Sequence, residues 1–538
     1  MKIKWRRVRI GGEILGNPVK KTEKNEEKKA GGGLLGTAAV MAFIILFSKA
    51  LGLVRDLLVA RAWGTTAPAV AYETASRLPI LIFDLVLGGV VSAAFIPVFS
   101  DLLVREGKRS AMRYAASYVN MIFCLTGAIT LLGVLFASPL VSFLAPDLPP
   151  ETAELASRLT VILFPMVICT GLAYSFVGIL QSMGEFRIPA LISLVSNAIM
   201  VVYLLFFRER FGIYGLAVAM LLGWAAQMVV QIPKLRVFGF RLMPGAGIFS
   251  PHTKRSLKMA LPILIGTWTQ PICAVINTRF ASAMEAGGAI SALGYANRLY
   301  TIIVGVFSFV ATNLLFPYFS RAASSGEVER SRHLMLSSVK TLSFIIAPIA
   351  VGVAILARPI SAILYQGGSF TEADTALTAA ALRCYAVGML FMAANEVLTK
   401  AFFAESRPRL PMYASLGAMA ANVVLVNLLA PMGIGGIALA SGLASGVQFV
   451  LNVIFWRRHT GAWIPASDFL DMGRSVLSAL VMGAALLLLL PYLPQSSILQ
   501  CVTAAAAGAV IYAVCTALIR SEEAGFLLRR IVRKKTTQ

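Results

Sequence analysis

The sequence contains few of the residues that most enzymes and metalloproteins use for chemistry. Its 538 residues include three histidines and six cysteines. The cysteines lie inside apolar stretches without a Cys-X-X-Cys spacing, and the histidines lie in loops or at the ends of such stretches. This pattern indicates neither a disulfide framework nor a zinc site. We therefore expect no metal, no cofactor, no catalytic residues and no enzymatic activity.

Charged residues are also scarce, at 14% of the chain against 58% for the hydrophobic set. A soluble domain usually has about 25% charged residues, so a water-soluble globular protein is excluded. An apolar stretch of about 20 residues can cross a bilayer as a helix. Such stretches account for more than half of the sequence, which predicts an all-α polytopic membrane protein.

Acidic residues are few, and 25 of them face 48 lysines and arginines, for a net charge of +23. Such an excess can indicate a nucleic-acid-binding protein. Here the basic residues concentrate between apolar stretches and at both ends of the sequence, a distribution that fixes helix orientation in a membrane. We therefore expect no nucleic-acid partner, contact with anionic membrane lipids, and both termini in the cytoplasm.

Fourteen apolar stretches are candidate membrane spans. They lie near residues 34–56, 78–100, 114–137, 157–181, 188–207, 213–235, 256–281, 294–317, 335–356, 377–403, 410–430, 433–456, 472–493 and 497–519. The predicted domains are a basic cytoplasmic tail (1–33), an N-lobe of six spans (34–236), a cytoplasmic linker (237–255), a C-lobe of six spans (256–458), a C-terminal helix pair (459–519) and a second basic cytoplasmic tail (520–538).

The two predicted lobes share a sequence repeat with an offset of 221 residues. Arg77 before the second span recurs as Arg298 before the eighth, and Gly212 before the sixth span recurs as Gly433 before the twelfth. Two units of six spans have the same orientation, as in transporters built from parallel repeats. The repeat therefore predicts a cavity between two lobes and transport by alternating access.

Charged side chains inside the predicted spans mark a candidate binding site. A charge near the bilayer centre costs at least about 2.5–3.5 kcal/mol, so each charge needs a partner or an aqueous cavity. The first span carries Lys49, Arg55 and Asp56, and the second carries Asp84. At 1.5 Å per residue, Lys49 and Asp84 both reach about 10 Å below the outer end of their helices. We therefore expect Lys49 and Asp84 to be in contact.

The repeat extends this polar set into the second lobe, where Gln270 matches Lys49 and Asn277 matches Asp56. Four arginines lie in the outer half of the spans, namely Arg55, Arg77, Arg279 and Arg298. Each alone could simply reach the outer interface. Together with Lys49 they favour a pocket for an anion. Because guanidinium groups bind phosphate oxygens through paired hydrogen bonds, a diphosphate head group is the expected ligand.

Five short motifs contain many of these residues. They are Phe47-Ser48-Lys49-Ala50-Leu51-Gly52-Leu53-Val54-Arg55-Asp56, Arg77-Leu78-Pro79, Ser92-Ala93-Ala94-Phe95-Ile96-Pro97, Tyr295-Ala296-Asn297-Arg298-Leu299 and Tyr365-Gln366-Gly367-Gly368-Ser369-Phe370-Thr371. With them the chain resembles the MurJ (MviN) family of lipid II flippases over nearly its whole length after the basic tail. The resemblance implies the fold of the multidrug, oligosaccharidyl-lipid and polysaccharide exporter superfamily.

The resemblance also implies a function. It implies a flippase that moves lipid II, the undecaprenyl-diphosphate-linked peptidoglycan precursor, from the inner to the outer leaflet of the bacterial cytoplasmic (inner) membrane. It implies coupling to the membrane potential or to a monovalent cation, and partners among the cell-wall synthesis machinery. The expected substrate-binding residues are Lys49, Arg55, Asp56, Arg77, Asp84, Asn297 and Arg298, with Glu73, Gln270, Asn277 and Arg279 as secondary candidates.

The sequence departs from the family pattern at several of these positions. Lys49 and Asp84 both stand where the family usually has arginine, and Asn297 replaces a common aspartate. Val70 stands at the position of an expected acidic residue, and Glu73 lies one helical turn further on. The charged residues of the site therefore differ from those usual in the family, and the identity of the lipid-linked substrate stays open.

The sequence leaves three alternatives to lipid II transport open. They are a flippase or exporter of another lipid-linked oligosaccharide, from capsule or spore polysaccharide synthesis, a cation-coupled drug antiporter, and a membrane glycosyltransferase. An antiporter of this superfamily would bury lone carboxylates in an apolar cavity, whereas the outer half here is rich in arginine. A glycosyltransferase needs paired carboxylates on a sizeable loop, and the outer connections reach only about twenty residues.

Overall fold

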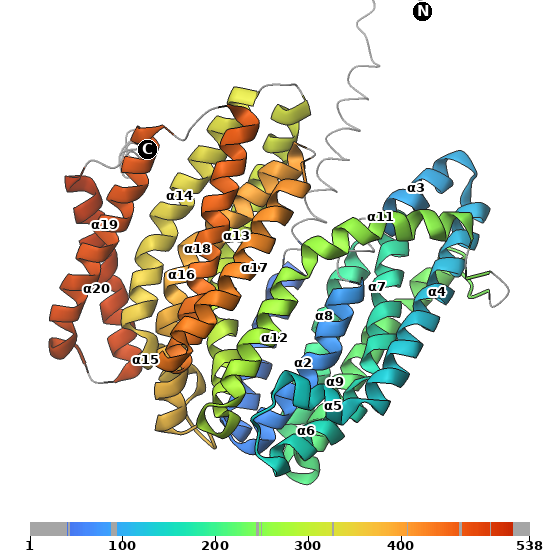
Figure 1. Ribbon diagram of the computed structural model, residues 1–538, viewed down its shortest axis with the longest axis horizontal. Coiled ribbons are helices and arrows are strands. Elements are labelled where there is room, and N and C mark those ends of the chain that lie inside the picture. The colour runs from blue at the N-terminus through green and yellow to red at the C-terminus, as the bar shows by residue number, and fades with distance from the viewer. Residues whose placement is uncertain are drawn as a thin grey trace, which may run out of the picture.

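The computed structural model of the chain is built of α-helices (Figure 1). It describes residue 40 and residues 43–87, 94–243, 247–248, 250–324, 328–405, 407–461, 465–494 and 496–519. Within these residues the β structure is limited to one isolated bridge, between Gly367 and Phe370. The all-α prediction is confirmed. The two predicted basic tails, residues 1–33 and 520–538, lie outside the described residues.

The first half of the chain forms one group of packed helices. A helix over residues 43–63 is followed by α2 (Ala67–Leu87), α3 (Ile96–Arg105), α4 (Lys108–Leu135), α5 (Ala137–Leu144), α6 (Pro150–Leu163), α7 (Met166–Ser182), α8 (Arg187–Phe206), α9 (Arg208–Val229) and α10 (Ile232–Val237). Helix α2 packs on α6, α7 packs on α4 and α9, and α8 packs on α9.

The second half forms another group, followed by a pair of helices at the carboxyl end. Its elements are α11 (Pro251–Thr267), α12 (Thr269–Ser282), η2 (Glu285–Gly287), α13 (Gly288–Ser324), α14 (Val328–Ile355), α15 (Ala357–Tyr365), α16 (Glu372–Ala404), α17 (Arg409–Leu429), η3 (Ala430–Met432), α18 (Ile434–Thr460), α19 (Ala466–Leu489), η4 (Leu490–Tyr492) and α20 (Ser497–Leu518). Helix α16 packs on α13, α14 and α18, and α19 packs on α14 and α20.

Eleven helical stretches among the described residues are long and apolar enough to cross a membrane. They coincide with eleven of the fourteen predicted spans. The stretches near 34–56, 78–100 and 256–281 are not among them, and these are the spans to which we assigned most of the charged and amide side chains. The helix of the second span begins earlier than predicted, because α2 starts at Ala67 and not near residue 78.

A helix break that occurs in both halves supports the sequence repeat. Gly212 has φ 54° and ψ −145°, and Gly433 has φ 75° and ψ −157°. A positive φ of this size is readily adopted by glycine and disfavoured for other residues. The two breaks lie 221 residues apart, at the start of the helical run to Val229 and of α18, so the repeat has a structural counterpart here.

One of the places where the two halves meet is the end of the molecule that contains Arg61 and Ser369, which we call the closed end. The backbone nitrogen of Ser369 donates to the carbonyl oxygen of Arg61 at 2.8 Å. Gly64 (φ +56°) faces the Ser369 carbonyl, and Gly368 (φ +60°) faces the Arg61 carbonyl, each without room for a side chain. Figure 1 shows the two helix groups converging at this end; toward the end where α3 lies they spread apart, except that α11 crosses over to the first group beside α3 and α4. The closed-end joint is therefore made of main-chain atoms.

Side chains reinforce this joint. The Tyr295 hydroxyl donates to the Gly64 carbonyl oxygen at 3.0 Å, and the Thr65 hydroxyl donates to Asp374. Asp374 also completes a capping box with Thr371 at the start of α16. A capping box satisfies backbone N–H groups that the first helical turn leaves free. Asp374, in the first turn of α16, therefore also connects this helix to the first half.

Buried ion pairs attach the carboxyl-terminal pair to the second group. The Lys340 ammonium nitrogen on α14 lies 2.9 Å from a carboxylate oxygen of Asp468 and 3.5 Å from one of Asp471. Arg474 lies 2.8 Å from the other oxygen of Asp471. Lys340 and Asp471 are buried, and a buried charge is stable only when it is paired. These contacts fix α19 against α14.

Helices α16 and α18 approach each other closely at Gly388 and Gly442, where a side-chain carbon added to Gly388 would lie 2.7 Å from the Gly442 Cα atom. We expect Gly388→Val to lower the thermal unfolding temperature of the purified chain, because overpacking costs about 1–3 kcal/mol. Gly352→Val in α14 is the matched control, since an added carbon there meets nothing within 4 Å. Equal shifts in the two variants would contradict the expectation.

Candidate functional site

A cluster of five charged side chains lies just inside the closed end. Arg298 of α13 donates from Nη2 to Glu73 Oε2 at 2.9 Å, and its Nε lies 3.7 Å from Asp56 Oδ2. Glu73 also lies 3.3 Å from Arg77 Nη2, and Asp56 lies 2.8 Å from Arg55 Nη2. We call these five residues the closed-end cluster. Three positive and two negative groups give it a formal charge of +1.

The cluster connects elements that are far apart in the sequence. Asp56 and Glu73 belong to the first half of the chain, Arg298 belongs to the second, and both carboxylates are buried at 7% and 9% exposure. Burying an ionised carboxylate is costly unless it is paired and hydrogen-bonded. Each carboxylate therefore stabilises the position of Arg298, and the cluster holds the two halves together.

Uncharged polar side chains orient two of the arginines. Arg55 Nη1 donates to Asn197 Oδ1 of α8 at 2.8 Å, and Asn197 Nδ2 donates to the Ser48 carbonyl oxygen at 3.1 Å. Arg77 Nη1 donates to Thr278 Oγ1 of α12 at 2.6 Å. Sequence reasoning missed Asn197 and Thr278, because a single amide or hydroxyl in an apolar stretch gives no distinguishing signal.

A cavity of about 260 Å³ adjoins the cluster. Its charged and amide lining residues are Glu73, Arg77, Asp84, Asn297 and Arg298, and most of the remaining wall is apolar. We call it the cationic cavity. Its two guanidinium groups can bind phosphate oxygens through paired hydrogen bonds, and its two carboxylates balance their formal charge. The structure thus brings together four predicted substrate-binding residues and the secondary candidate Glu73.

The expected contact between Lys49 and Asp84 is absent from this structure. Neither side chain makes a hydrogen bond or an ion pair with a described residue, and Lys49 is exposed on the helix over residues 43–63. Equal depth along two helices does not fix their rotation, so the sequence could not decide which faces meet. Asp84 instead lines the cationic cavity.

A second cavity, of about 460 Å³, shares Arg77 and Asn297 with the first. We call it the amide cavity, after the six carboxamide side chains in its wall, Gln270, Asn277, Asn297, Asn395, Asn422 and Gln448. The secondary candidates Gln270 and Asn277 therefore lie beside the cationic cavity, as the repeat suggested. Asn395, Asn422 and Gln448 were not among the predicted site residues.

Arg279 lies apart from the arginines of the closed-end cluster. Its Nη1 donates to the Phe143 carbonyl oxygen at 2.9 Å, and its guanidinium lies 5.9 Å from the centre of the Phe143 ring. It is not among the lining residues of either cavity. Successive residues on a helix point about 100° apart, so the neighbouring Thr278 contacts Arg77 while Arg279 packs on α5. In this structure the secondary candidate Arg279 therefore lies outside both cavities, apart from Arg77 and Arg298.

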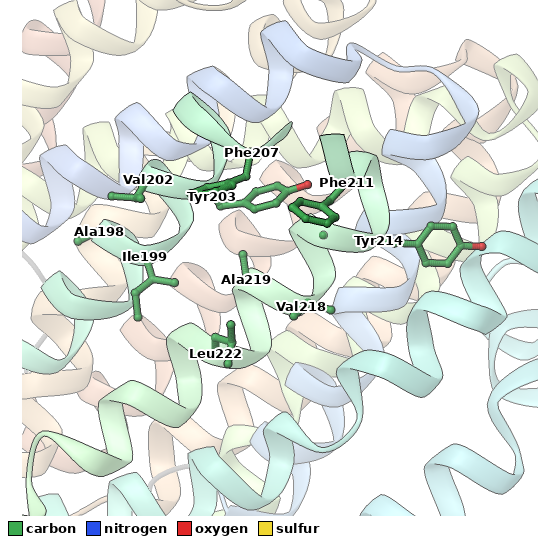
Figure 2. Close-up of a pocket in the computed structure, with 11 residues that line it drawn as sticks. Ala198, Ile199, Val202, Tyr203, Phe207, Phe211, Tyr214, Val218, Ala219 and Leu222 are labelled. Carbon is green, nitrogen blue, oxygen red and sulfur yellow. The ribbon is translucent and has the colours of Figure 1, made fainter. Parts of the chain in front are cut away.

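An apolar groove of about 640 Å³ lies between α8 and α9 (Figure 2). Figure 2 shows Tyr203, Phe207 and Phe211 at one end of it, and Val202 and Leu222 further along. The described residues that line this groove are uncharged and mostly apolar. It therefore suits a hydrocarbon chain.

The chain is similar in sequence to known proteins. A family model described as "Lipid II flippase MurJ" matches residues 59–503. A "Probable lipid II flippase MurJ" from Rhizobium meliloti (strain 1021) is 29% identical over 490 residues, which cover 87% of this chain and 91% of the relative. One from Bdellovibrio bacteriovorus is 30% identical over 448 residues, which cover 81% of this chain and 84% of the relative.

Solved structures have the same fold. One described as "Lipid II flippase MurJ, inward closed conformation" superposes with a TM-score of 0.77 at 21% identity, covering 89% of this chain and 98% of that protein. A multidrug resistance MATE family transporter of the MOP superfamily, in an inward-facing conformation, superposes with a TM-score of 0.66 at 14% identity, covering 79% of this chain and 98% of that protein.

Proposed function

The chain belongs to the lipid II flippase MurJ family, and from this premise we propose that it moves lipid II from the inner to the outer leaflet of the bacterial inner membrane. The observation that carries the proposal is the pair of adjoining cavities beside the closed-end cluster. The cationic cavity presents guanidinium groups to a diphosphate, and the amide cavity presents uncharged hydrogen-bonding groups. The polyprenyl chain stays in the surrounding lipid.

We propose an architecture of fourteen transmembrane helices, with an N-lobe (34–236), a linker (237–255), a C-lobe (256–458) and a C-terminal pair (459–519). The matched helix breaks at Gly212 and Gly433 support a parallel repeat of two six-helix lobes. Positive residues concentrate at the cytoplasmic side of membrane proteins. This rule places both termini in the cytoplasm and the closed end at the outer face.

The closed-end cluster suggests how a ligand would open the transporter. A diphosphate that enters the cationic cavity competes with Glu73 for the guanidinium groups of Arg77 and Arg298. A ligand shifts a conformational equilibrium by binding one state more tightly than the other. When the phosphate oxygens replace the carboxylate, the contact between the halves weakens, and the lobes rock to expose the cavity at the outer face.

We propose that transport is coupled to the membrane potential or to a monovalent cation. Moving one elementary charge through 100 mV is worth about 2.3 kcal/mol. The closed-end cluster carries a formal charge of +1, so its movement would respond to the potential. Membrane lipids, and the enzymes that use lipid II in cell-wall synthesis, are the proposed partners.

A second candidate is a flippase for another lipid-linked oligosaccharide, such as a capsule or spore polysaccharide precursor. Asp84 is the observation that favours it, because this carboxylate, which forms no ion pair with a described residue, lines the cationic cavity where a diphosphate would lie. A carboxylate there changes the charge that the site presents. It would select a head group with a neighbouring positive group.

Depletion of the chain in its native cell tests the proposed function. We expect lipid II to accumulate in the inner leaflet. The leaflet is assigned from the accessibility of the lipid to added enzymes, and the amount is measured by extraction and mass spectrometry. Re-expression of the chain should restore normal levels. Accumulation of a capsule intermediate with unchanged lipid II would refute the proposal in favour of the second candidate.

A further inference from the structure

A further cavity, of about 480 Å³, lies in the second half of the chain beside η2. We call it the side cavity. Its walls come from η2, the start of α13, α16, η3 and the start of α18. None of its lining residues also lines the cationic cavity or the amide cavity. The side cavity is therefore a separate candidate binding site.

Two side chains of opposite charge line the side cavity without pairing with each other. Glu285 is exposed and makes no hydrogen bond or ion pair with a described residue. Arg383 donates from Nε to the Ala354 carbonyl oxygen at 3.3 Å, and its terminal nitrogens donate to no described residue. The other lining residues are uncharged. The cavity therefore offers one carboxylate and one guanidinium group to an occupant.

The backbone holds Glu285 in a conformation that is disfavoured for its residue type. Glu285 has φ 51° and Ala286 has φ 50°, and a positive φ is uncommon for residues other than glycine. Such conformations persist where the surrounding contacts impose them, and they cluster at ligand sites. The next residue, Gly287, packs against Leu148 and Val70 of the first half without room for a side chain. The turn that presents the carboxylate is thus held in place from outside the cavity.

Exposed apolar side chains continue from the side cavity along two of the helices that line it. Val387 of α16 is 46% exposed and follows Arg383 by four residues, and Leu443 of α18 is 36% exposed and follows Gly435 by eight. Positions i, i+4 and i+8 belong to one stripe of a helix. At 1.5 Å per residue, these side chains lie about 6 Å and about 12 Å further along. Half of the hydrocarbon core measures about 15 Å, so the apolar path has the depth of one leaflet.

The two charges and the apolar path together favour a phospholipid whose head group is zwitterionic. A guanidinium group binds phosphate oxygens through paired, charge-assisted hydrogen bonds. A carboxylate accepts hydrogen bonds from a primary ammonium group. Phosphatidylethanolamine carries both a phosphate and a primary ammonium group, joined by a short linker. A volume of about 480 Å³ lies within the usual range of ligand pockets, about 300–1,000 Å³.

We propose that the side cavity binds the head group of phosphatidylethanolamine from the outer leaflet, with the phosphate at Arg383 and the ammonium group at Glu285. One acyl chain then lies along α16 and α18. The inference goes beyond the proposed function, because this lipid is not the transported cargo and its site is separate from the cationic and amide cavities. Only the assignment to the outer leaflet depends on the proposed orientation of the chain.

Phospholipids that differ only in the head group test this site. The purified full-length chain in detergent is titrated with phosphatidylethanolamine, phosphatidylcholine and phosphatidylglycerol that carry the same acyl chains, and bound lipid is measured by native mass spectrometry. We expect phosphatidylethanolamine to bind about fivefold more tightly than each of the others, the upper end of the effect of an exposed ion pair. Phosphatidylcholine has a cation without an N–H group, and phosphatidylglycerol has no cation.

Two variants separate the contributions of the two charges. Glu285→Gln should abolish the preference for phosphatidylethanolamine over phosphatidylglycerol, because it removes the carboxylate that attracts the ammonium group. Arg383→Gln should weaken the binding of both lipids by a similar factor, about three- to fivefold, because both carry the phosphate. A general loss of lipid binding would not produce this pair of results.

Glu209→Gln and Arg210→Gln are the matched controls. Both residues are exposed at the start of α9, and neither lines the side cavity, so these variants should bind each lipid as the unaltered chain does. Thermal unfolding verifies that each variant is folded, and the preference is a ratio measured within one protein.

Three results would overturn the inference. They are the absence of a preference in the unaltered chain, a preference that persists in folded Glu285→Gln, and an equal loss of preference in Glu209→Gln. Displacement of bound phosphatidylethanolamine by undecaprenyl diphosphate would also overturn it, because the side cavity would then belong to the cargo. Since transport of lipid II is not measured, these results leave the proposed function standing.

Discussion

Arg298→Ala is expected to abolish lipid II transport while the chain still folds and inserts. Arg298 is the member of the closed-end cluster that comes from the second half of the chain, and it faces both Glu73 and Asp56. Removing one partner of a buried ion pair costs about 3–5 kcal/mol, because the other charge is left uncompensated. The variant would lose a phosphate-binding group and the contact that holds the closed end together.

Transport by the Arg298→Ala variant is measured by complementation. Cells depleted of the natural chain receive the variant, and growth, inner-leaflet lipid II and the amount of membrane-inserted protein are recorded. Lys258→Ala is the control, since Lys258 is an exposed cation on α11 and is not among the residues lining either cavity. Complementation by Arg298→Ala at the level of Lys258→Ala would remove Arg298 from the transport site.

Glu73→Gln is expected to shift the conformational equilibrium away from the closed state. Glu73 accepts from both Arg77 and Arg298, at 3.3 Å and 2.9 Å, and is 9% exposed. A hydrogen bond to a charged group is worth about 1.5–3 kcal/mol. Its loss should change the ratio of closed to open molecules by about tenfold to one hundredfold.

The shift is measured as a distance across the closed end. Paramagnetic labels on non-canonical amino acids at the exposed positions Glu151 and Ala373 report the separation of α6 and α16 in nanodiscs. Glu154→Gln is the matched control, because Glu154 and Arg158 form an i,i+4 pair like that of Glu73 and Arg77 but are 65% and 64% exposed. Exposed pairs contribute only about 0–1 kcal/mol. Similar distance distributions in the unaltered chain, the Glu73→Gln variant and the Glu154→Gln variant would show that Glu73 does not hold the halves together.

Much of the fold could be predicted because its cause is local. Each apolar stretch must be helical to satisfy its backbone hydrogen bonds in lipid, and eleven predicted spans coincide with such helices. The spans near 34–56, 78–100 and 256–281 were harder, because they carry the polar groups of the site. Glu73 and Arg77 form an ion pair within α2, so that helix continues through sequence that looked like a loop.

The candidate site could be predicted only in part. Charges within spans need partners, and on that ground Arg77 and Arg298 were expected to share one aqueous space, which the cationic cavity contains. The rotation of each helix could not be predicted from one sequence. It decides that Thr278 rather than Arg279 meets Arg77, and that Glu73 lies at the centre of the cluster.

The main-chain joint at the closed end has a consequence for how such a molecule can evolve. The contact between Arg61 and Ser369 uses backbone atoms, and its geometry depends on Gly64 and Gly368. Replacing side chains elsewhere leaves it intact. A lineage could therefore exchange its cargo by altering the interior walls, while the main-chain contact that closes this end is inherited unchanged.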